Sequence, residues 1–373
     1  MIKRTVTSIL LLLLCTGCWD KREITQLALV EMIAFDHDDK GSYSAYFQVL
    51  NPTSIQARQV GPAKASVYTY SVKADNFGSI LEQLNSTTSR KLFTSHLQIY
   101  VVSERAARSG ILPFVNYLEM NPERRTNVYA VVSDSTISEL MKNFTPLDRV
   151  PGRYIRLIID WHARAHGMVK SPSRIKDIIN GIPRSRPTVI PILHFMGKEA
   201  GSTSDRLENI DATQQNFNIR DGAVFINARM MGRINSTNCE LYNVLNNYAN
   251  RFFIKIKVHN QNVEIIARNI RIKRKWNKQR RQLLVDVKAE LQLVSNEQKN
   301  PLTLINQHDI ERAFNARFNQ LAEDFVALGL RNNWDLLGIG DTSYGRKNWK
   351  TIDACFDVQS KVTLAGNTIS PYN

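Results

Sequence analysis

Cysteine is scarce in this sequence, and its scarcity sets the first limit on the fold. The 373 residues include four cysteines, two of which, Cys15 and Cys18, lie close to the N-terminus. The other two, Cys239 and Cys355, are too few for the disulfide framework that holds small secreted domains together. The sequence does not exclude a bond between these two, but it favours two buried free thiols.

Long apolar runs are missing as well. The apolar run of the N-terminus, Val6 to Leu14, is far shorter than the roughly 20 residues that a helix needs to cross a bilayer. After Cys18 no segment is long and apolar enough to do so. We therefore expect the rest of the chain to be extracytoplasmic and to lie outside the bilayer.

The N-terminus has the pattern of a secretory signal peptide. Two basic residues precede the apolar run, and the small residues Thr16 and Gly17 stand directly before Cys18. A cysteine at this position is typical of lipoproteins, because its thiol is a strong nucleophile that takes a diacylglycerol. We therefore predict a signal peptide over residues 1–17 and a covalent acyl lipid on Cys18. The alternative is an ordinary signal peptide with an incidental cysteine. One residue departs from the lipoprotein pattern, because Cys15 stands where lipoprotein signals usually carry leucine.

Acidic residues are outnumbered. Lysine and arginine total 49 against 34 acidic residues, a net charge of +15, which falls to +13 without the predicted signal peptide. A basic protein held at an anionic membrane surface gains electrostatic attraction. Nucleic acid is the usual other partner for such a charge, but export of the chain argues against it.

The positive charge is densest between Arg268 and Arg281. We expect this run to form a hairpin tip that meets anionic headgroups or an acidic face of a partner protein. The predicted contact residues are Lys273, Arg274, Lys275 and Lys278. The alternative is a solvated hairpin whose charges suppress pairing at its edge.

Patterns typical of enzymes and metal sites are absent or weak. His162 and His166 have the four-residue spacing of metal ligands on a helix, but without further ligands they indicate an ordinary helix surface. Asp335 and Asp341 lie in a glycine-rich run that lacks the spacing of a calcium or phosphate loop and favours a tight turn. The acidic run Asp36 to Asp39 indicates a hairpin turn. We therefore expect no catalytic site, no metal and no cofactor other than the lipid.

Strands and helices alternate in the first half of the chain. Apolar segments rich in β-branched and aromatic residues predict strands at 27–35, 43–50, 67–72, 97–102 and 128–132. Helical periodicity predicts helices at 76–86, 104–109, 113–120, 136–143, 154–165 and 173–180. This alternation indicates a mixed sheet covered by helices.

The second half has a different pattern, after a small, polar segment that begins at Gly197. A short strand at 223–226 and a helix opened by a capping box at Thr237 and Glu240 precede an antiparallel meander. The meander strands are expected at 253–259, 263–276 and 283–294. An amphipathic helix over 310–328, ended by Gly329, and a last strand at 355–364 follow.

These patterns predict a multi-domain α+β protein with mixed or antiparallel sheets flanked by helices. We place an N-terminal α+β domain at 18–196, a linker at 197–218 and a C-terminal α+β region at 219–373. A further split of the C-terminal region near residue 247 is the alternative.

Several short runs resemble one known family in the order in which they occur. The run Gly17 to Ile24 (GCWDKREI) resembles the start of the C-subunit lipoproteins of bacterial spore germinant receptors, the Ger(x)C family. Further matching runs are His96–Glu104 with Gly110 and Ile111, Asn121–Arg125, Gly222–Phe225 with Gly232, Asp335–Gly340, and Trp349 with Lys350.

The resemblance implies a fold of three α+β domains and a non-catalytic role. It implies one subunit of a three-part receptor in the inner membrane of a dormant spore, beside integral-membrane A- and B-type subunits. Such receptors respond to nutrient germinants and start germination. As an alternative function, the chain would be a solute-binding lipoprotein that captures a germinant directly.

Overall fold

The computed structural model describes residues 23–364 of the chain, apart from 39–40, 53–64, 121–123, 144, 146–147, 149, 166, 171–172, 185, 197–215, 278, 297–303, 343–344 and 346–348. The predicted signal peptide, Cys18 and Lys278 lie outside the described residues, as do Asp39 and His166. Within the described part of the chain, no helix has both the length and the hydrophobicity to cross a bilayer.

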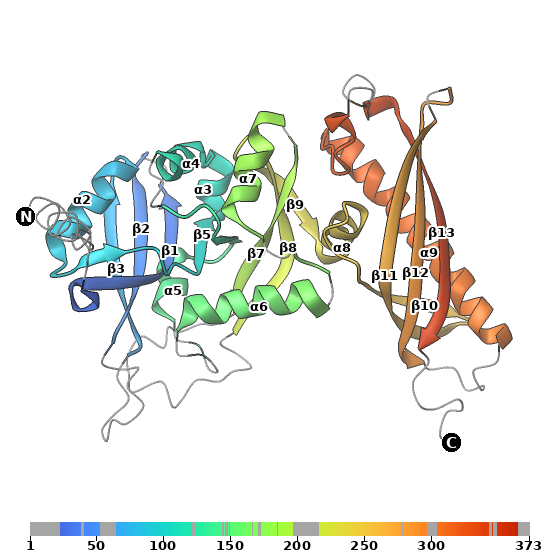
Figure 1. Ribbon diagram of the computed structural model, residues 1–373, viewed down its shortest axis with the longest axis horizontal. Coiled ribbons are helices and arrows are strands. Elements are labelled where there is room, and N and C mark those ends of the chain that lie inside the picture. Colours follow the sequence, from blue (N-terminus) through green and yellow to red (C-terminus); the bar gives the residue numbers. More distant parts are fainter. Residues whose placement is uncertain are drawn as a thin grey trace, which may run out of the picture.

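A mixed sheet organises the first part of the chain (Figure 1). Its centre is parallel, and the short strands β5 (Ile99–Ser103) and β6 (Tyr129–Ser133) are almost wholly buried there, as strands covered on both faces should be. The order across the sheet is β3-β2-β1-β5-β6-β7-β8-β9, with antiparallel pairs at both ends. The other strands are β1 (Leu27–His37), β2 (Tyr43–Leu50), β3 (Val67–Ala74), β4 (Lys91–Phe93, parallel to β1), β7 (Thr188–Met196), β8 (Asn216–Ile226) and β9 (Arg229–Asn235).

Helices cover both faces of this sheet because successive side chains of a strand point to opposite faces. In β1, Ile33 and Phe35 belong to one core, and Met32 and Ala34 belong to the other. The first core is covered by α2 (Phe77–Thr87), α3 (Glu104–Ser109), α4 (Leu112–Glu119) and α7 (Ile175–Gly181). The second is covered by α5 (Ile137–Lys142) and α6 (Pro151–Ala165).

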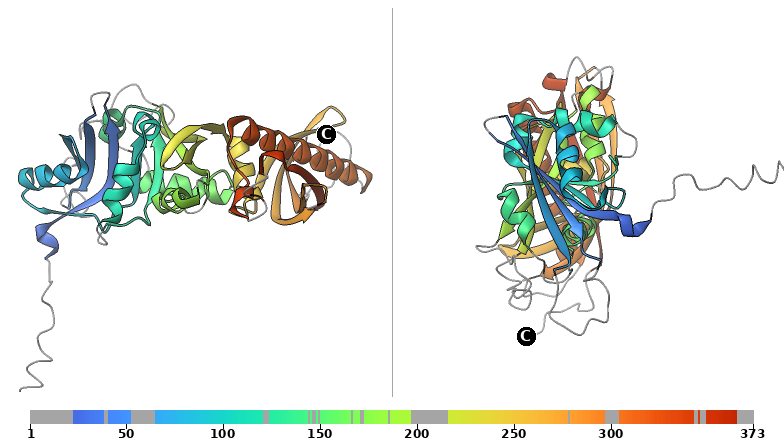
Figure 2. Two further views of the ribbon diagram at one scale, coloured as in Figure 1. Left: turned by 90° about the horizontal axis from the view of Figure 1, so that it is seen from above. Right: turned by 90° about the vertical axis from the view of Figure 1, so that its left-hand side faces the viewer.

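A second sheet stands beside the first along the long axis of the molecule (Figures 1 and 2). It has the order β10-β11-β12-β13, antiparallel except for the parallel pair of β12 and β13. A long helix packs on one face through the fully buried Phe314, Phe318 and Phe325. The elements are β10 (Phe252–Val258), β11 (Gln261–Asn277), β12 (Gln282–Asn296), α9 (Leu304–Asn332), η4 (Ile339–Asp341), η5 (Trp349–Thr351) and β13 (Asp353–Leu364).

We call residues 23–235 the first lobe and residues 252–364 the second lobe, and α8 (Ser236–Leu245) lies between them (Figure 1). β8 and β9 follow the expected linker in the sequence, yet they extend the first sheet, because β8 pairs with β7. The chain passes to the second sheet after α8, close to the alternative split at residue 247.

The capping box expected at Thr237 and Glu240 is not formed. Asn235, and not Thr237, caps α8, and its side chain accepts a hydrogen bond from the Asn238 N–H. Glu240 turns instead into the protein, where it accepts a hydrogen bond from the Phe253 N–H at 3.0 Å.

Both described cysteines are free thiols, as the sequence favoured. Cys239 is buried, and burial raises the pKa of its thiol far above the usual range. Cys355 is only half-buried, because it lies on β13 at the edge of the second sheet.

Candidate functional site

The glycine-rich run between α9 and β13 forms a tight turn at the junction of the two lobes. The Asp335 carboxylate accepts hydrogen bonds from the Ile339 N–H at 2.8 Å and from the Gly340 N–H at 2.6 Å. Gly338 has a φ of 63°, a conformation that glycine adopts without strain. The turn is therefore the one that the sequence favoured over a calcium or phosphate loop.

Side chains from β11 and from the end of α8 hold this turn. Arg274 of β11 donates one hydrogen bond to the Leu337 carbonyl at 2.7 Å and another to the Leu245 carbonyl, the end of α8, at 2.6 Å. Asn246 donates to the Leu336 carbonyl at 2.9 Å. These bonds join the turn, β11 and the end of α8 to one another, so together they fix how the second lobe sits on α8.

The first lobe reaches the same turn through Arg186 and Gly232. The Arg186 guanidinium lies 2.9 Å from the Asp341 carboxylate, and its atoms would lie 3.1 Å from a Cβ placed on Gly338. Gly232 of β9 packs directly on the Trp334 ring, since a Cβ at Gly232 would lie 2.5 Å from the ring. Two of the glycines at this junction, Gly232 and Gly338, thus belong to the runs on which the family resemblance rests.

A cleft of about 460 Å³ opens beside this junction. One wall comes from the β8–β9 hairpin of the first lobe, with Ile226 and Met231. The other wall comes from the end of α9 and the segments that follow it, with Asn333, Asp341 and Trp349. Its volume lies in the range of sites for small molecules, which occur preferentially where domains meet.

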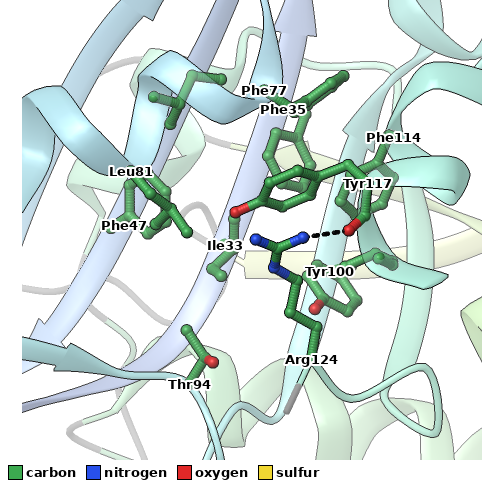
Figure 3. Close-up of a pocket in the computed structure, with 12 residues that line it drawn as sticks. Ile33, Phe35, Phe47, Phe77, Leu81, Thr94, Tyr100, Phe114, Tyr117 and Arg124 are labelled. Carbon is green, nitrogen blue, oxygen red and sulfur yellow. Dashed lines mark hydrogen bonds between the residues drawn. The ribbon is translucent and has the colours of Figure 1, made fainter. Parts of the chain in front are cut away.

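A second and much smaller cavity, of about 40 Å³, lies inside the first lobe (Figure 3). Its walls are mostly aromatic and aliphatic side chains from β1, α2 and α4. The Arg124 guanidinium lies 3.6 Å from the centre of the Tyr117 ring and donates a hydrogen bond to the Tyr117 carbonyl. This volume suffices for about three water molecules and indicates a packing void more than a ligand site.

The predicted basic contact residues do not share one environment. Lys273 and Lys275 are exposed on the outer face of the second sheet, and the Lys275 ammonium lies 3.3 Å from the Asp286 carboxylate. Arg274 between them points inward, where burial lowers the pKa of its guanidinium. Arg274 is therefore a structural residue of the junction and is not available for a membrane or a partner.

The weaker candidates have ordinary structural partners. Asp36 lies 2.6 Å from the Arg105 guanidinium, and Asp38 lies 2.5 Å from the Lys73 ammonium. His162 lies half-buried on α6. Among the residues that the structure describes, no cluster of three or more His, Cys, Asp or Glu side chains could hold a metal ion.

Comparison with known proteins identifies the family. Residues 20–195 match the spore germination protein N-terminal domain, and residues 220–367 match the C-terminal domain described as spore germination B3/GerAC like. Spore germination protein KC of Bacillus subtilis (strain 168) is 25% identical over 96% of this chain and 92% of its own length. Spore germination protein B3 of the same organism is 24% identical, over 46% of each chain.

The fold agrees with this assignment. The crystal structure of the GerBC protein superimposes with a TM-score of 0.54 and 11% sequence identity, covering 88% of this chain and 96% of that one. The chain therefore belongs to the GerAC-like family of spore germination proteins, a family of non-enzymatic germinant-receptor C-subunits.

Proposed function

We propose that this chain is the lipid-anchored C-subunit of a nutrient germinant receptor, held on the outer face of the spore inner membrane by Cys18. Membership of the receptor C-subunit family supports this proposal, together with a cysteine directly after a signal-peptide pattern. The anchor keeps the protein beside integral-membrane A- and B-type subunits, which raises its effective concentration near them.

The single observation that supports lipid anchoring is the position of Cys18 directly after Thr16 and Gly17. Two acyl chains hold a protein stably at a bilayer, at about 0.8 kcal/mol for each buried methylene group, whereas one chain binds marginally. A Cys18→Ser variant should incorporate no labelled palmitate and should leave the membrane fraction.

The matched control is Cys15→Leu, which restores the usual leucine of a lipoprotein signal and should be lipidated at least as well. Mass spectrometry of the mature N-terminus distinguishes the two outcomes. A working receptor whose C-subunit begins with an unmodified Cys18 would contradict the proposal.

The cleft between the lobes favours a second candidate function. A protein of this family with a cleft of about 460 Å³ is in a position to bind a small solute itself, in addition to its role as a receptor subunit. This candidate does not require that the chain act alone.

A further inference from the structure

The two walls of the cleft beside the junction differ in character. The first lobe contributes two apolar side chains, Ile226 and Met231, together with the Arg186 guanidinium, and Met231 on β9 is 49% exposed. The second lobe contributes mainly polar groups, among them Asn332, Asn333 and Asp341. The indole of Trp349 adds a half-buried aromatic ring on the polar side.

The fixed charges along the cleft are largely compensated. Arg186 and Asp341 form an ion pair at 2.9 Å, and the Asp335 carboxylate accepts two backbone hydrogen bonds. A charged ligand would therefore find no free counter-charge on Arg186 or Asp341, which already neutralise each other. Lys350 lies at the exposed rim, with its ammonium 5.8 Å from the centre of the Trp349 ring.

Among the hydrogen bonds of the described residues, the polar wall keeps groups that can still donate and accept. The Asn332 amide uses one N–H on the Leu328 carbonyl, which leaves its other N–H and its carbonyl oxygen. Asn333 adds a second amide group, and its backbone φ of 57° holds it beyond the end of α9. Amide groups both donate to and accept from hydroxyl groups, and a carboxylate accepts from them, whereas an apolar ligand would leave these groups unpaired.

A sugar ring or a cyclic polyol matches both walls, because it has an apolar face of C–H groups and a rim of hydroxyls. We propose that the cleft between the lobes binds a small, neutral, polyhydroxylated molecule, with its C–H face against Trp349 and Met231 and its hydroxyls on the Asn332, Asn333 and Asp341 side chains. Because its walls come from both lobes, a bound ligand also stabilises their relative orientation.

The test uses the full chain in a detergent without a sugar headgroup. Glucose and myo-inositol serve as probes, L-alanine serves as a zwitterion of similar size, and binding is followed by ligand-observed NMR. We expect both polyols to bind with a Kd in the millimolar range and L-alanine not to bind. The readout requires neither the lipid nor the receptor, so its failure is distinct from failure of the proposed function.

Two variants locate the site. Trp349→Ala removes the ring, and Met231→Arg fills the cleft from the other lobe at an exposed position that should not disturb folding. Each should weaken polyol binding at least tenfold. The matched controls are Trp161→Ala, at a tryptophan 66% exposed on α6, and Met120→Arg, at a methionine 84% exposed after α4, and both should bind like the unaltered chain.

Three results would overturn the inference. The first is that neither polyol binds the unaltered chain. The second is that both cleft variants bind as well as their controls, which would place the site elsewhere. The third is that L-alanine binds in the cleft and the polyols do not, which would refute the class of ligand.

Discussion

At the scale of single residues, Glu240 has a carboxyl group that is buried inside the protein. It is 8% exposed on α8, between the two lobes, and burial raises its pKa to about 8. The hydrogen bond from the Phe253 N–H opposes that rise without cancelling it. The protonated form is therefore the one that the folded protein favours near neutral pH.

This burial predicts a loss of stability in mild alkali. A raised pKa means that the contribution of Glu240 is fully present below about pH 4.5 and is lost as the pH rises through about 8. Between those limits the loss is on the order of 5 kcal/mol. Glu240→Gln should remove this pH dependence, so thermal melts of the variant should fall less between about pH 6 and pH 9.

The control for Glu240→Gln is the same change at Glu82, which is exposed on α2. Glu82→Gln should leave the melting profile of the unaltered chain unchanged. If the Glu240 and Glu82 variants lose stability in parallel as the pH rises, the buried carboxyl is not the cause.

The strand that contains Arg274 was predicted from the sequence, but the face of the sheet on which its side chain lies was not. The basic run was predicted as a strand, and side chains of a strand alternate between faces. Lys273 and Lys275 therefore share the solvent face, and Arg274 falls on the opposite face with Ile272 and Trp276. Charge density alone grouped the three residues, whereas periodicity would have separated Arg274 from its neighbours.

The partners of Arg274 could not be predicted in this way. Its two shortest hydrogen bonds go to the Leu245 and Leu337 carbonyls, which are 29 and 63 residues away in the chain. Every residue has a backbone carbonyl, so the sequence does not indicate which carbonyls accept hydrogen bonds from Arg274. The same holds for Asn246, whose partner is the Leu336 carbonyl, and this explains why the junction was not predicted as a site.

The structure predicts that Arg274→Lys loosens the junction. A single ammonium group cannot bond to two carbonyls in the fixed geometry of a guanidinium, and one carbonyl would lose its charged partner, at a cost of about 2 kcal/mol. Equilibrium unfolding measures this loss. Lys275→Arg is the control, since Lys275 is exposed, and an equal loss in both variants would contradict the role of Arg274.

At the scale of elements, α9 is a helix whose existence could be predicted from the sequence and whose C-terminal end could not. Its apolar spacing correctly predicted a long helix, but Gly329 does not end it. The helix continues to Asn332, and Asn333 with a φ of 57° follows it. Glycine is required at 329 because a Cβ there would lie 2.7 Å from the Trp334 carbonyl oxygen.

Gly329→Ala should therefore destabilise the protein although alanine is the better helix former. Alanine gains about 1 kcal/mol over glycine inside a helix, but forcing the turn away from α9 should give a net loss of about 1–2 kcal/mol. Chemical denaturation measures the difference. Arg317→Ala, at an exposed position of the same helix, should be neutral, and a stabilised Gly329→Ala variant would refute the packing role.

β9 is a strand that was not predicted from the sequence. Asn227 and Ala228 form its turn, with φ values of 51° and 58°, where a two-residue hairpin usually places glycine second. Only Met230 and Ile234 of the strand are buried. A polar edge strand that follows an unusual turn has little apolar alternation. The sequence therefore predicted only a short strand at 223–226 in place of the hairpin.

At the scale of the molecule, the exposed basic residues lie far from the start of the described chain. The second sheet occupies one end of the long axis, whereas β1, β2 and β3 occupy the other end (Figure 1). The anchor proposed at Cys18, which precedes residue 23, would therefore tether the end of the molecule opposite to Lys273 and Lys275. This separation favours an acidic partner surface over lipid headgroups as the target of the basic tip.

The last prediction tests that target. The double variant Lys273→Glu and Lys275→Glu should lower recovery of the membrane subunits with this chain by at least several-fold and should slow germination, because opposite charges steer association. The effect should weaken at high salt, which screens exposed charges. The matched control is Lys255→Glu with Lys257→Glu on β10, two lysines that are also exposed but lie away from the hairpin turn. Unchanged recovery and germination in the first variant, or an equal loss in both, would show that the tip is only a solvated hairpin whose charges prevent edge pairing.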